Sequence, residues 1–244
     1  MEIRGSVAFV TGGAVRVGRA IALSLAQAGA NVAIGYHTSA DAAAETVHDI
    51  KALGGRGLAV HADLADVNQV RAAVARVHDH FGALDIVVNS ASHFVTTPLL
   101  TTTYDEWRRV LAVLLDGSFF LLQAAAPLMQ ARGGGVIVNV LDGSIDTPWP
   151  RFPAHAAGKM GLLSLTRNLA VELAPAIRVN AVVPGPVLPP DGYPPDKTER
   201  TARKTLLQRW GTPQDVADAV SFLIRADYVT GAVLHVDGGQ RWAA

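Results

Sequence analysis

Cysteine is absent from this chain of 244 residues. Disulfides, thiolate metal sites and a cysteine nucleophile are therefore excluded, and the composition fits a reducing, cytoplasmic setting. The chain also lacks an excess of charge of either sign, because 21 Lys and Arg residues balance 21 Asp and Glu residues. A nucleic-acid partner is not expected from such a balance, since a polyanion selects a basic surface.

Long hydrophobic runs and targeting signals are also missing. Gly, Asp or Pro interrupts each apolar run before the ~20 residues that a membrane span requires, and Met1 to Gly5 carry no signal-peptide pattern. Metal-ligand spacing is absent from the scattered histidines, which are His48, His61, His78, His80 and His235. We therefore expect a soluble cytoplasmic protein with no metal and no membrane partner.

Hydrophobic residues make up 50% of the chain, in apolar β-rich runs that alternate with Ala- and Leu-rich helical stretches. The predicted strands are Val7–Val10, Val32–Ile34, Gly57–Val60, Ile86–Val88, Val136–Val140, Ile177–Val183 and Val233–Val236. The predicted helices are Val17–Ala28, Ala40–Leu53, Asn68–Phe81, Tyr104–Arg132, Ala154–Leu173 and Thr212–Ile224. The pattern predicts one α/β domain over residues 1–244, a Rossmann-type doubly wound parallel sheet of about seven strands flanked by helices on both faces.

One proline-rich segment, Leu188–Lys197, interrupts this alternation and is a poor candidate for regular structure. Insertions of this kind in a compact domain are often lids, so residues 188–206 are expected to form a substrate loop. The alternative is a mobile surface loop.

A glycine-rich turn, Thr11–Gly18, lies between the first predicted strand and the first predicted helix. Such a turn lets the backbone approach a pyrophosphate, and the helix N-terminus supplies free N–H groups and a partial positive charge. This position predicts a dinucleotide site; the alternative is a tight turn without a ligand.

The choice of nicotinamide cofactor depends on the end of the second strand. An acid there usually binds the ribose 2′-hydroxyl of NAD, but this strand ends in His37, Thr38 and Ser39. Together with Arg16 in the turn, these donors suit a 2′-phosphate, so we predict NADP(H). Alternatively, Arg16 and His37 are solvated surface groups and Ser39 caps a helix.

With these motifs in place, the chain resembles the short-chain dehydrogenase/reductase family over nearly its whole length. The matching segments are Thr11–Gly18, Asp63, Asn89–Ser92, Arg178–Asn180, Pro184–Gly185 and Val229–Gly239. The resemblance implies the following cofactor-binding residues: Gly12, Arg16, Val17, Gly18, His37, Thr38, Ser39, Asp63, Leu64, Asn89, Ala91, Lys159, Pro184 and Gly185.

Within that family the sequence is most similar to the pteridine reductases. The similarity is carried by Arg16, Tyr36–Ser39, Asn89–Phe94, Thr97–Leu100 and Asp142. It implies that Phe94 stacks on a pterin and that Ser92 and Arg16 bind the pterin or the cofactor phosphates. Alternatively, Phe94 is an ordinary core aromatic. Trp149, flanked by prolines, is a candidate for the substrate mouth.

The family's catalytic Tyr-x-x-x-Lys motif reads here as His155 to Lys159. Asp142 lies 13 residues before His155 and occupies the place of the usual catalytic Ser, while Leu114 replaces a supporting Asn. The predicted catalytic residues are Asp142, His155 and Lys159. We expect protons to come from His155, whose ordinary pKa suits neutral pH, and from a water positioned by Asp142. The alternative is a weakened or lost activity.

The combined prediction is an NADPH-dependent reductase of a small pterin-like substrate, with a dihydropterin as the specific case, acting by hydride transfer. One alternative is a generic ketoreductase, such as a 3-oxoacyl-thioester reductase. Another is an NADPH-binding protein that senses or regulates. The family resemblance also implies a homotetramer, whereas the Ala- and Leu-rich helix faces could instead pack only on the sheet.

Overall fold

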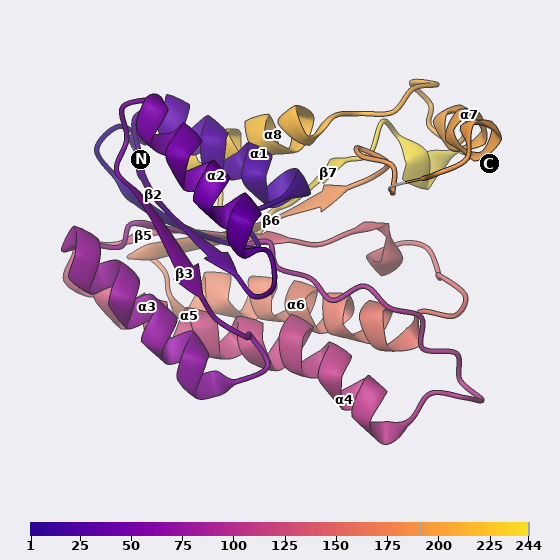
Figure 1. The fold of residues 1–244 in the computed structure, drawn as a ribbon, viewed down its shortest axis with the longest axis horizontal. Helices are drawn as coiled ribbons and strands as arrows, with labels where there is room; N and C mark the ends of the chain where they lie inside the picture. Colours follow the sequence, from indigo (N-terminus) through magenta and orange to yellow (C-terminus); the bar gives the residue numbers. More distant parts are fainter. Residues whose placement is uncertain (191, 244) are drawn as a thin grey trace.

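A computed structural model describes residues 1–190 and 192–243. Within them lies one parallel sheet of seven strands in the order β3-β2-β1-β4-β5-β6-β7, as Figure 1 shows. The strands are β1 (Val7–Thr11), β2 (Asn31–Tyr36), β3 (Gly57–His61), β4 (Ile86–Asn89), β5 (Gly135–Val140), β6 (Ile177–Pro184) and β7 (Val233–Val236). The predicted doubly wound α/β fold is confirmed.

Helices cover both faces of this sheet (Figure 1). On one face are α1 (Arg16–Gln27), α2 (Ala40–Ala52) and α8 (Pro213–Arg225), which bury apolar side chains such as Ile21, Ile50 and Val220 against it. On the other are α3 (Val67–Phe81), α4 (Tyr104–Leu111), α5 (Gly117–Ala131) and α6 (Pro153–Glu172). Because the inner strands, such as β1, β4 and β5, are buried on both faces, they have the continuous hydrophobic character on which the prediction rested.

Two predicted elements differ from the structure. The predicted helix Tyr104–Arg132 is divided, because a π-helical turn, η1 (Ala112–Asp116), separates α4 from α5. The proline-rich segment is more regular than expected, since α7 (Pro195–Arg203) begins inside it. Proline is compatible with the first turn of a helix, where its missing N–H costs nothing. Residue 191 of this segment lies outside the described residues.

The helical run Tyr104–Ala131 also corrects the expectation that no segment is apolar enough for a membrane. By length and composition this run passes that test, with half of its most apolar window buried in the domain. Leu121 and Met129 of this run belong to the core between the sheet and α3, as expected of an internal helix.

The sheet order fixes where a ligand can bind. β1 lies between β2 and β4. From β1 the chain adds β2 and β3 on one side of the sheet, then crosses over and adds β4 to β7 on the other side. At such a switch point the loops after the strands separate and open a crevice at their carboxyl ends. There the Thr11 hydroxyl accepts hydrogen bonds from the backbone N–H groups of Ser90 (3.0 Å) and Ala91 (3.1 Å), which ties the end of β1 to the loop after β4.

Candidate active site

The glycine-rich turn joins β1 to α1 at this crevice. Gly12 has a φ of 63°, and a Cβ on Gly18 would collide with the carbonyl oxygen of Gly12. Arg16 also has a positive φ, 52°, a conformation that favours glycine. The N-cap residue Val15 supplies no side-chain cap, so the first N–H groups of α1 are free to meet a ligand.

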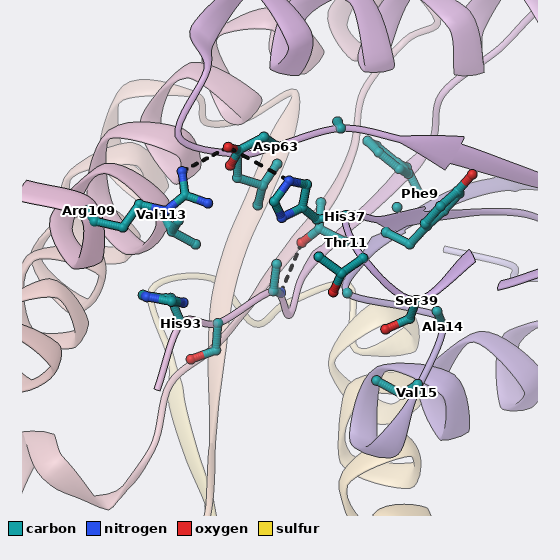
Figure 2. A pocket seen from close by; sticks show the side chains of 18 residues that line it. Phe9, Thr11, Ala14, Val15, His37, Ser39, Asp63, His93, Arg109 and Val113 are labelled. Carbon is teal, nitrogen blue, oxygen red and sulfur yellow. Dashed lines mark hydrogen bonds and ion pairs between the residues drawn. The ribbon is translucent and has the colours of Figure 1, made fainter. Parts of the chain in front are cut away.

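A first cavity of about 450 Å³ lies beside the turn at the ends of β1, β2 and β3 (Figure 2). It brings together many of the predicted cofactor residues: Gly12, His37, Thr38, Ser39, Asp63, Leu64 and Ala91. Two further lining residues, His93 and Arg109, were not predicted. Arg109 lies on α4, remote in sequence from the turn, so no local pattern could have indicated it.

Asp63 is the charged centre of this cavity. Arg109 Nη1 lies 2.8 Å and His37 Nε2 lies 3.9 Å from Asp63 Oδ2, and the dashed lines in Figure 2 mark both pairs. Burial alone would raise the pKa of Asp63, but the hydrogen bond and charge of Arg109 outweigh it and lower that pKa. The carboxylate is therefore compensated chiefly by the Arg109 guanidinium.

A second cavity of about 520 Å³ lies on the other side of the turn and shares Gly12, Val15, Ala91 and Ser92 with the first. It is lined by further predicted residues from the turn, the loops after β5 and β6, and α6: Arg16, Val17, Gly18, Asp142, Trp149, Lys159, Pro184 and Gly185. The two cavities together form one continuous crevice along the carboxyl ends of the strands.

Two of the predicted cofactor residues, Arg16 and Asn89, do not line the first cavity. The exposed Arg16 donates from Nη2 to the Leu188 carbonyl oxygen at 3.2 Å, across the second cavity, and does not line the first. Asn89 is buried and lines neither cavity. Its amide nitrogen donates instead to Ser118 Oγ (2.8 Å) and Asn139 Oδ1 (3.3 Å), so Asn89 holds β4 against α5 and β5.

Asp142, His155 and Lys159 meet as the four-residue spacing on a helix predicts. His155 Nε2 lies 2.7 Å from Asp142 Oδ2, and Lys159 Nζ lies 4.0 Å from the same oxygen. Lys159 also donates to the Val140 carbonyl at 2.8 Å, and the Asp142 Oδ1 atom accepts from the Ser144 backbone N–H at 3.0 Å. The end of β5, η2 (Gly143–Ile145) and α6 therefore fix the three groups.

The charges of this cluster are strongly coupled. Burial would raise the pKa of Asp142, but the hydrogen bond from His155 and the charge of Lys159 lower it to about 2. Burial lowers the pKa of Lys159, and the Asp142 carboxylate offsets part of that effect. Near neutral pH the second cavity thus presents the ionised Asp142 carboxylate beside the Lys159 side chain.

His155 and Phe94 border the cluster without lining the second cavity. The His155 side chain is 1% exposed; Trp149 stacks on its ring at 6.1 Å and Phe94 meets it edge-on at 4.9 Å. Phe94 is 56% exposed, so it is not a core residue, and one of its faces stacks on Phe152 at 4.5 Å. Leu114, which the family resemblance predicts at the place of a supporting Asn, is buried beside Gly158.

Metal ligands do not gather anywhere in the described ranges 1–190 and 192–243, where no group of three or more His, Cys, Asp or Glu side chains could hold an ion. His235 instead pairs with Asp146 at 2.8 Å.

The sheet order and the glycine-rich turn at its switch point define a Rossmann-type α/β domain. Residues 13–241 match a family profile described as enoyl-(acyl carrier protein) reductase. With relatives at 36% identity over 96% of its length, the chain belongs to the short-chain dehydrogenase/reductase family.

Relatives with known names span several substrates. The 3-oxoacyl-(acyl-carrier-protein) reductase FabG of Staphylococcus aureus is 36% identical, covering 96% of this chain and 97% of its own. The 3beta-hydroxysteroid dehydrogenase 1 of Eggerthella lenta is also 36% identical, covering 98% and 95%. A blue fluorescent protein from a metagenomic library, crystallised with NADPH, superposes with a TM-score of 0.89 at 36% identity, covering 98% and 99%.

Proposed function

We propose that this chain is an NADP(H)-dependent oxidoreductase that interconverts a ketone and a secondary alcohol. The observation that carries the proposal is the pair formed by Asp142 and Lys159, which faces a cavity continuous with the nucleotide crevice. The relatives named for 3-oxoacyl reduction and hydroxysteroid oxidation support carbonyl chemistry. They favour the ketoreductase alternative of the sequence analysis over the pterin substrate.

The residues around the turn fit a phosphorylated dinucleotide. Gly12 and Gly18 leave the backbone bare where side chains would collide, and no acid stands at the end of β2, where His37, Thr38 and Ser39 line the first cavity. The NADPH complex of the blue fluorescent protein supports the same cofactor here. When bound, the nicotinamide supplies or accepts the hydride.

The protein's own contribution is to bind and orient. The first cavity would receive the adenosine end, and Arg16 would reach a phosphate by exchanging its contact with Leu188. In the second cavity Lys159 Nζ would donate hydrogen bonds to oxygens of the bound ligand, and the Asp142 carboxylate would accept a hydrogen bond from a substrate hydroxyl. Holding cofactor and substrate side by side makes hydride transfer effectively unimolecular, which lowers the entropic part of its barrier.

A pterin remains a second candidate because of one observation. The exposed Phe94 lies beside the cluster, and because one face already stacks on Phe152, at most one face is available to a flat heterocycle. A dihydropterin therefore belongs in the substrate panel.

The test is NADPH oxidation, followed by absorbance, with an acetoin-type ketone, a 3-oxoacyl thioester and dihydrobiopterin. We expect turnover of a ketone, and a loss of roughly 10²–10⁴-fold in Asp142→Asn and Lys159→Met. Turnover of dihydrobiopterin alone would favour the pterin candidate. Binding of NADPH without turnover of any substrate would overturn the enzymatic proposal and favour a sensor.

We further propose a homotetramer. Exposed apolar side chains lie on α5 and α6, namely Phe119, Met160 and Val171, and in water such faces favour association. Sedimentation showing a monomer at micromolar concentration would contradict the assembly.

A further inference from the structure

We propose that His155 is a positioning residue: it holds the Asp142 carboxylate toward the second cavity, and Asp142 is the side chain that meets the substrate. The inference rests on the proposed function for the identity of the substrate, but its geometry stands independently. It reverses the roles expected from the sequence, where His155 donates protons and Asp142 positions a water.

The first argument is access. Asp142 and Lys159 line the second cavity, whereas His155 does not and is 1% exposed. Trp149, itself a lining residue, lies parallel to the His155 ring at an interplanar angle of 6°. A ligand in the cavity therefore meets Asp142 and Trp149 before it can reach His155.

The second argument is the proton on the ring. His155 Nδ1 is buried and, over residues 1–190 and 192–243, has no hydrogen-bond partner. A proton there would be a buried, unsatisfied donor, which is unfavourable. Because the ionised Asp142 carboxylate can only accept, the proton of the 2.7 Å contact belongs to His155 Nε2, which donates to Asp142 Oδ2.

The third argument is that His155 does not act alone on Asp142. Lys159 faces the same oxygen from α6 at 4.0 Å, and Ser144 donates to the other oxygen from η2. Without the His155 N–H, the carboxylate keeps one charged neighbour but loses its shortest side-chain bond to α6. We therefore expect the pKa of Asp142 to rise, and its carboxylate to be held less firmly toward the second cavity.

The test compares His155→Phe, which keeps a flat apolar ring but removes the donor, with His155→Gln, whose amide can still donate. In alcohol oxidation with NADP⁺, the acid limb of the rate profile should move upward by about 1 pH unit or more in His155→Phe. His155→Gln should restore the wild-type limb and most of the rate. His235→Phe is the matched control, because it removes an equivalent pair with Asp146 and should leave the limb in place.

A readout that needs no turnover separates this inference from the proposed function. Titration of the Asp142 carboxyl carbon by ¹³C NMR should show the same upward shift in His155→Phe. That shift without alcohol oxidation would sustain the positioning role and refute the proposed reaction. An unshifted carboxyl in His155→Phe would overturn the inference, as would a loss of roughly 10²-fold or more in His155→Gln, which would indicate a direct proton donor.

Discussion

Gly18 is the residue where the backbone of the turn and the first helix come closest. A Cβ at this position would collide with the Gly12 carbonyl oxygen, so Gly18→Ala forces the start of α1 away from the turn. We expect the Kd for NADPH to rise at least about tenfold, equivalent to about 1.4 kcal/mol, as measured by fluorescence titration. Gln27→Ala, at an exposed position of the same helix, should bind as the parent does.

Asp142 links the site to the acid stability of the fold. Its pKa is lowered from 3.8 to about 2 in the folded chain, so its stabilising contribution is present above the unfolded value and is lost as pH falls through the folded one. As pH falls from 5 to 3, protonation of this carboxyl should lower the free energy of unfolding by about 1 kcal/mol.

Urea unfolding at the two pH values measures that difference, and Asp142→Asn should reduce it by the same amount. The exposed Asp79→Asn serves as the control. If the slope with pH in Asp142→Asn equals that of the parent, the carboxylate does not titrate as its contacts indicate.

At the same scale, only part of the site could be predicted. The spacing from His155 to Lys159 is enough to place both side chains on one helix face, and both do contact Asp142. The burial of the His155 ring could not be predicted, because it depends on Trp149 folding back from a loop. The ion pair between Asp63 and Arg109 could not be predicted either, because it joins the end of β3 to α4, two segments far apart in the sequence.

At the scale of elements, α6 lies close against the π-helical turn at Gly158. A Cβ there would lie 2.8 Å from Leu114 Cβ, too close for the two helical segments to stay in place. We expect Gly158→Ala to cost about 1–3 kcal/mol by overpacking, and Leu114→Ala to cost about 2–5 kcal/mol by leaving a cavity.

Leu114→Ala keeps the Cβ that the new methyl group would meet, but it removes Cγ and Cδ1, which would also lie within 3.5 Å of that group. Because part of the crowding is thereby relieved, the double variant should lose less than the sum of the two single losses. Denaturant unfolding of the four proteins measures the coupling. Strict additivity would show that the two positions do not share this contact.

The regular elements were predictable because each carries its own pattern. All seven predicted strands occur with bounds within two residues of those observed, since continuous hydrophobic runs reflect burial on both faces. The π-helical turn at Ala112–Asp116 and α7 were not predicted. The first has the same apolar periodicity as an α-helix, and the second begins with prolines that also end helices.

At the scale of the whole molecule, the two cavities are lined by the loops that follow β1 to β6, so a ligand that filled both would contact most of the sheet. A ligand that binds only the folded state stabilises it by about 2.7 kcal/mol at a concentration 100-fold above its Kd. For a chain of this size that corresponds to a Tm increase of about 5–10 °C. We expect NADPH to produce such an increase in a thermal-unfolding experiment.

NADH is the matched ligand, because it differs from NADPH only in lacking the 2′-phosphate. Since β2 ends without an acid and is followed by His37, Thr38 and Ser39 in the first cavity, nothing at that strand end replaces the phosphate contacts with a bond to the ribose hydroxyl. NADH at the same concentration should therefore raise the Tm by clearly less. Equal increases would mean that the first cavity does not recognise the phosphate, and the assignment of NADP(H) would fail even if hydride transfer were observed.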